Sequence, residues 1–145
     1  MTAMRGRIAY RTTHLEGLDQ GYQVLAVYDQ AIHMARAAAA RLAGREAGDV
    51  LGPLREASAC VAALQEALDF LRGEEVAVNL WRLYEFVRTS LERAWEEGDA
   101  EAAEDALFVL ESLRDGWRRW TREAAGATGP VVCTYREPVC EAVIC

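Results

Sequence analysis

Hydrophobic residues recur at intervals of three and four positions along most of the chain, and polar residues fill the positions between them. This spacing places the apolar side chains on one face of an α-helix. Four segments show it, and we expect helices at about residues 16–43, 50–72, 74–97 and 99–124. No segment before Gly126 alternates with a period of two, so no strand is predicted there.

Short polar connections separate the four segments and carry residues that end and begin helices. Gly98 suits the left-handed conformation that ends a helix, and Asp99 suits the cap of the next one. Asp49 is a suitable cap for the second helix, which Gly73 is expected to end. Connections this short force neighbouring helices to run antiparallel and in contact. The sequence therefore predicts an all-α fold, an antiparallel up-down-up-down four-helix bundle with a short N-terminal arm.

Each predicted helix has one continuous apolar face that we expect to be buried. On the second segment this face comprises Leu54, Ala57, Val61, Leu64, Leu68 and Leu71. On the third segment it comprises Val76, Leu80, Leu83, Tyr84, Val87, Leu91 and Ala94. Trp81 falls outside this face, so its side chain is expected to be turned toward solvent.

The chain changes character after Gly126. Residues 127–145 contain Pro130, Pro138, three cysteines and several β-branched side chains, so the fourth helix cannot continue through them. We expect a bundle domain over residues 1–126, followed by an extended, non-helical tail. The tail carries too many apolar side chains for a solvated linker, so it should lie on the bundle or on a partner.

Composition and charge restrict the function. The 145 residues suffice for one domain with a sizeable core, since 52% of them are hydrophobic. A net charge of −7 argues against a nucleic-acid partner, which requires a basic face. The chain has no apolar run long enough to span a membrane, and its first residues lack the apolar core of a secretory signal. We therefore expect a cytoplasmic location without membrane insertion.

Side chains that could support catalysis or metal binding are few. The cysteines are Cys60, Cys133, Cys140 and Cys145. They form no C-x-x-C pair, lie far in sequence from both histidines, and are expected to be reduced in the cytosol. We expect Cys60 to be buried and inert. The sequence thus predicts no enzyme, no metal site and no cofactor, although a small enzyme or metal carrier that uses the tail cysteines stays open as an alternative.

The residues alone indicate a helical bundle that binds another protein, with a partner helix lying in an apolar groove. They leave the oligomeric state open, a homodimer included.

Three stretches, in the right order, resemble the flagellin export chaperone family, FliS. GEEVAVNLWRLYEFVRTSLERA at residues 73–94 is similar to the family pattern G-[G/E]-E-[I/V]-A-x-N-L-x-x-L-Y-x-[F/Y]. The matching residues there are Gly73, Glu75, Val76, Ala77, Asn79, Leu80, Leu83 and Tyr84. Residues 98–117 resemble the family's last helix, and residues 24–38 its first, including Tyr28 and Asp29. Tyr10 stands where the family keeps an N-terminal tyrosine.

The resemblance implies a cytosolic chaperone that binds the disordered C-terminal region of flagellin. Such a chaperone prevents premature polymerisation and delivers flagellin to the flagellar export gate, without catalysis or cofactor. The candidate groove residues are Leu54, Val61, Leu64, Leu68, Leu80, Tyr84 and Val87. Ile8 and Tyr10 would cap the groove or contact the export gate. The alternative is a bundle of the same fold that binds a partner other than flagellin or associates with itself.

Overall fold

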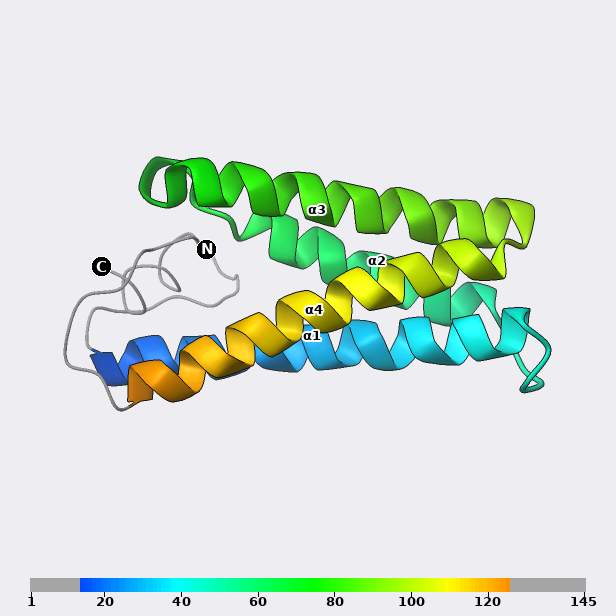
Figure 1. The fold of residues 1–145 in the computed structure, drawn as a ribbon, viewed down its shortest axis with the longest axis horizontal. Coiled ribbons are helices and arrows are strands. Elements are labelled where there is room, and N and C mark those ends of the chain that lie inside the picture. Colours follow the sequence, from blue (N-terminus) through cyan, green and yellow to red (C-terminus); the bar gives the residue numbers. More distant parts are fainter. Residues whose placement is uncertain (1–13, 126–145) are drawn as a thin grey trace.

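The chain folds into four α-helices in the computed structural model, which describes residues 14–125 and, within them, the side chains of residues 21–71 and 73–123. The helices are α1 (His14–Leu42), α2 (Leu51–Glu66), α3 (Phe70–Glu97) and α4 (Ala100–Ala125). Consecutive helices run antiparallel, and α4 also packs against α1, which closes the bundle (Figure 1). The prediction of an all-α four-helix bundle is confirmed.

Several predictions concern residues outside this range. Ile8, Tyr10 and the tail at residues 127–145 lie outside the described residues. Their roles, and the domain limits of 1–126, therefore stay predictions.

The core is built from aliphatic side chains, alanines and two tyrosines. Its largest fully buried side chains are Tyr28, Tyr84, Ile32, Leu54, Leu68, Leu91, Leu110, Val61 and Val87. All of them except Leu68, which lies in the connection between α2 and α3, come from the four helices. This is expected when amphipathic helices bury their apolar faces against one another.

Tyr28 and Tyr84 meet across the centre of the bundle. Tyr28 lies on α1 and Tyr84 on α3, which are diagonally opposite because each packs mainly against α2 and α4. Their rings are 6.4 Å apart with 48° between their planes, and their hydroxyl groups form a hydrogen bond. Burying a hydroxyl group is unfavourable unless it is hydrogen-bonded, so this contact allows two polar groups to occupy the core.

The predicted helix cap at Asp99 is confirmed by its hydrogen bonds, whereas Asp49 lies one residue outside the cap position of α2. A side-chain oxygen of Asp99 accepts the backbone N–H groups of Glu101 and Ala102 at 3.0 and 3.1 Å. The preceding Gly98 has φ +66°, the left-handed conformation expected at the end of α3. The residue directly before α2 is Val50, which makes no side-chain capping bond. Asp49, one position earlier, accepts the N–H of Gly52 at 3.0 Å through a side-chain oxygen and so satisfies one free donor of the first turn.

The predicted end of the second helix is wrong. Helix α2 ends at Glu66 rather than near Arg72, and Leu71, expected on the buried face, is 90% exposed. The reason is Asp69, whose side chain accepts the N–H of Leu71 at 3.0 Å and whose carbonyl accepts the N–H of Gly73 at 2.7 Å. These local bonds offer the backbone an alternative to continuing α2.

Glu74 separates the short first turn of α3 from its main part. It has φ +47° and ψ −124°, and it is the one non-glycine residue with positive φ in the described part of the chain. A side chain in such a conformation costs about 1–3 kcal/mol. The corner between α2 and α3 is therefore strained.

We expect Tyr28→Phe and Tyr84→Phe to lower the free energy of unfolding by about 1 kcal/mol each, the net contribution of a buried hydrogen bond. Both substitutions remove the same bond, so the double variant should lose clearly less than the two losses together. Urea denaturation of the four proteins tests this. Strictly additive losses would show that the two hydroxyl groups do not interact.

Replacing Glu74 with glycine should raise the free energy of unfolding by about 1 kcal/mol, because glycine adopts this conformation without strain. Glu92→Gly is the matched control, since Glu92 is exposed inside the regular part of α3. It should lower stability by about 1 kcal/mol. Thermal unfolding followed by circular dichroism measures both, and equal losses in the two variants would contradict strain at Glu74.

Candidate functional site

The structure places most of the predicted groove residues in the core. Those buried to 3% exposure or less are Leu54, Val61, Leu64, Leu68, Tyr84 and Val87. Leu80 is partly exposed and packs at the edge of the core. In this conformation the seam between α2 and α3 is closed, so these six side chains reach a partner only if the two helices separate. Their contact with a partner stays a prediction.

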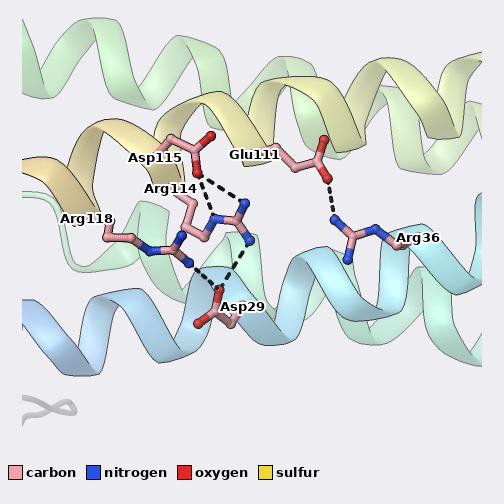
Figure 2. Close-up of polar contacts among 6 residues, drawn as sticks. All are labelled: Asp29, Arg36, Glu111, Arg114, Asp115 and Arg118. Atoms are coloured by element: carbon pink, nitrogen blue, oxygen red, sulfur yellow. Dashed lines mark hydrogen bonds and ion pairs between the residues drawn. The ribbon is translucent and has the colours of Figure 1, made fainter.

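Polar contacts between α4 and α1 show which side of α4 faces α1. Arg114 and Arg118 of α4 both approach a carboxylate oxygen of Asp29 on α1, at 3.5 and 3.9 Å. About two turns after Asp29 on α1, Arg36 pairs with Glu111 of α4 (Figure 2). Most of these groups are well exposed, so each pair contributes about 0–1 kcal/mol. Their main value here is geometric, because they define the orientation of α4.

The opposite flank of α4 is apolar and only partly covered. With 3.6 residues per turn, the residues on this flank are Val109, Leu113, Gly116 and Trp120. Val109, Leu113 and Gly116 lie on the side of α4 opposite these ion pairs, toward α3, which also packs on α4. The Trp120 ring instead reaches back to α1. All four keep intermediate exposure, although the three apolar side chains touch the core cluster.

The contacts of the buried Gln65 show which side of α3 faces α2. The side-chain amide of Gln65 on α2 donates to a carboxylate oxygen of Glu85 at 2.8 Å, and its carbonyl accepts from Arg88 at 2.8 Å. Glu85 and Arg88 therefore mark the side of α3 that faces α2. Trp81 lies on this side too and is 42% exposed, as the sequence predicted.

The flank of α3 away from α2 also carries apolar side chains, namely Val76, Leu80 and Leu83. The prediction that Val76 and Leu83 are core residues is wrong, since they are 46% and 39% exposed. Ala77 occupies the buried position at the start of this helix instead. The reason lies in the course of α4, which does not cover this end of α3.

Side-chain size explains why α3 and α4 separate. Next to the Gly98 connection the facing residues are small and buried: Ser90, Ala94, Ala102 and Ala106. They let the two helices approach closely there. Toward the other end the facing residues are leucine, valine and tryptophan, and α4 diverges from α3 to end beside the first turns of α1 (Figure 1).

The apolar side chains on these two flanks are only partly covered, and we call them together the α3–α4 surface. It consists of Val76, Leu80, Leu83, Val109, Leu113 and Trp120. Val76 and Leu83 are exposed, and the other four side chains are half-buried. Accessible apolar side chains on neighbouring helices make this surface a candidate site for binding another protein.

Trp120 is held in place by α1. Its ring stacks on Trp117, with 5.0 Å between centroids, and the indole N–H of Trp117 donates to the carbonyl of Gly21 at 3.1 Å. A Cβ atom at Gly21 would lie 3.4 Å from the Trp120 ring. The missing side chain thus lets α1 approach the two rings closely. Sequence reasoning treated Gly21 only as a weak helix former and missed this contact.

The α3–α4 surface has the chemistry of a binding site rather than of a catalytic centre, because its side chains are all hydrocarbon or indole. Cys60 lies elsewhere, on α2, where burial and the nearby Glu56 carboxylate raise the pKa of its thiol. This keeps the thiol protonated and poorly reactive at neutral pH. Within residues 14–125 no three His, Cys, Asp or Glu side chains gather where a metal ion could bind.

None of the four described helices combines the length and the apolar character needed to cross a membrane.

Comparisons with known proteins point to one family. The family model described as "Flagellar protein FliS" matches residues 3–124. The flagellar secretion chaperone FliSB of Pseudomonas aeruginosa is 35% identical over 72 residues, which are 50% of this chain and 55% of that relative. The chain thus aligns with about half the length of this curated relative. No solved structure matches the chain.

We expect Gly21→Leu to lower the free energy of unfolding by about 1–3 kcal/mol, because the new side chain would displace the Trp120 ring. Gly116→Leu is the matched control, since a Cβ atom there has no neighbour closer than 4.0 Å. It should cost nothing and gain helix propensity. Urea denaturation followed by tryptophan fluorescence distinguishes the two. Equal stability of the two variants would refute close packing at Gly21.

Proposed function

Because the chain belongs to the flagellar protein FliS family, we propose that it is a cytoplasmic flagellar export chaperone. It binds the disordered C-terminal region of flagellin, prevents premature polymerisation and delivers flagellin to the type III export apparatus of the flagellum. The family match and the name of the relative from Pseudomonas aeruginosa support this role.

The observation that carries the proposal is the partly exposed α3–α4 surface. A disordered segment that forms an amphipathic helix presents apolar side chains at every third or fourth position, and such a helix can lie along a row of apolar side chains. On α3 that row is Val76, Leu80 and Leu83, at similar spacing. Leu80 thus belongs both to this surface and to the groove predicted from sequence.

Binding at this surface requires no separation of α2 and α3. The six buried groove residues then act by holding α3 in position, while their direct contact with flagellin would require α2 and α3 to separate and expose these core side chains. A surface that is already exposed avoids that cost. A disordered segment already loses free energy when it becomes ordered on binding, so a site that needs no separation of helices suits it better.

The N-terminal arm has a separate proposed role. As the family resemblance implies, Ile8 and Tyr10 contact the export gate or cap the empty cargo groove predicted from the sequence. Both lie outside the described residues.

Calorimetric titration with a peptide from the C-terminal region of the host flagellin tests the proposal. We expect saturable binding with a strongly negative heat-capacity change, because apolar area is buried as the peptide folds. A flat titration would refute flagellin binding and leave the alternative of another partner or of self-association.

The binding surface is tested by Leu83→Glu, which should weaken peptide binding at least tenfold, equivalent to about 1.4 kcal/mol. The matched control is Thr89→Glu, which adds the same charge at an exposed position of α3 away from the α3–α4 surface. It should leave the affinity unchanged. If Leu83→Glu binds as tightly as Thr89→Glu, the peptide binds elsewhere on the bundle.

A further inference from the structure

The α3–α4 surface extends from the middle of the bundle to the end where α4 finishes. Trp120 stands less than two turns before Ala125, the last residue of α4. Val76, near the start of α3, is at the same end because the two helices are antiparallel (Figure 1). A segment that follows α4 therefore begins within two turns of Trp120, beside the first turns of α1 and on the side opposite the start of α3.

The 19 residues that follow Gly126 have the composition of a ligand for such a surface. Their bulky apolar side chains are Val131, Val132, Tyr135, Val139, Val143 and Ile144. Prolines at 130 and 138 prevent a continuous helix, so these side chains cannot be buried by simply extending α4. Left in water, they would expose apolar area that the bundle is able to cover.

The segment is long enough to reach the whole surface. Extended, 19 residues span about 60 Å. The distance along α4 from Trp120 to Val109 is about 16 Å, and that along α3 from Val76 to Leu83 is about 10 Å. Tethering at Ala125 also gives an effective concentration on the order of millimolar, so even a weak contact is substantially occupied.

We propose that residues 127–145 bind the α3–α4 surface of their own chain when flagellin is absent and compete with flagellin for it. That flagellin is the ligand displaced by the tail rests on the function proposed above. The contact between the tail and the bundle does not depend on that function. Competition lowers the apparent affinity for cargo by the fraction of chains whose surface is free. It also shields the apolar surface from unspecific contacts while the chaperone is empty.

Residues 1–13 are the other candidate within the chain, and they suit the surface less well. They carry Arg5, Arg7 and Arg11, and Tyr10 is their one aromatic residue. Arginine side chains are unfavourable to bury against apolar area without a partner. The charged side chains of the tail are Arg136, Glu137 and Glu141, which are of both signs and spread over 19 residues. The tail also has a higher density of β-branched aliphatic side chains.

The contact is tested in the full chain by replacing Val131, Val132, Val139, Val143 and Ile144 with serine. The matched control replaces Thr134 and Arg136 with alanine, which leaves the apolar side chains of the tail intact. Hydrogen exchange followed by mass spectrometry reports on the peptides that cover residues 76–83 and 109–120. Circular dichroism must first show the same helix content in both variants and in the unaltered protein.

We expect these two regions to exchange several-fold faster in the serine variant and at the unaltered rate in the control. A synthetic peptide of residues 127–145, with serine in place of its three cysteines, should restore slow exchange when added to the serine variant. It should fail to do so when Leu83→Glu is added to that variant. Unchanged exchange in the serine variant would overturn the proposal.

Two further outcomes would also overturn it and would identify another occupant. Faster exchange after Ile8→Ser and Tyr10→Ser, but not in the serine variant of the tail, would assign the surface to the N-terminal arm. Exchange that depends on protein concentration in the same way in all variants would assign it to a second copy of the chain.

The flagellin peptide then separates this inference from the proposed function. It should bind the serine variant about fivefold more tightly than the unaltered chain, because the competing segment no longer occupies the surface. Faster exchange without binding of the flagellin peptide to either protein would support the intramolecular contact and refute the proposed cargo. Equal affinity of the two proteins for the peptide would overturn competition.

Discussion

The contact between α3 and α4 determines the shape of the molecule and the position of its candidate binding surface. Alanines and a serine bring the two helices together next to Gly98, whereas bulky side chains at the far end hold them apart. Because α4 then follows α1, Val76 and Leu83 lose the cover that their spacing would otherwise give them. The same helices thus form a tight core at one end and an apolar surface at the other.

The other polar contacts of the bundle keep this arrangement in place. Tyr28 and Tyr84 connect the diagonally opposite helices α1 and α3 through a hydrogen bond that is shielded from water. Gln65 connects α2 to Glu85 and Arg88 of α3. A buried polar pair is favourable only when the two helices are in the right register, so these contacts select one alignment of the helices. The exposed ion pairs between α1 and α4 add little stability.

Much of the fold could be predicted from the sequence, because helical periodicity and the cap at Asp99 are local signals. The predictions that proved wrong depend on tertiary contacts. Leu71 fits the periodicity of α2, but the hydrogen bonds of Asp69 end that helix earlier. Val76 and Leu83 fit the periodicity of α3, but periodicity alone does not reveal where α4 diverges. The size gradient between Ala102 and Trp120 was the available signal for it.

The central claim is that flagellin binds the α3–α4 surface while the seam between α2 and α3 stays closed. Methyl NMR spectra recorded during titration with the flagellin peptide test it most directly. The valines and leucines of the α3–α4 surface are different residues from those in the seam between α2 and α3, so their signals report on the two sites independently. The account predicts large shifts for Val76, Leu83, Val109 and Leu113, and small shifts for Leu54 and Val61. Large shifts confined to Leu54, Val61 and their neighbours in the seam would contradict it.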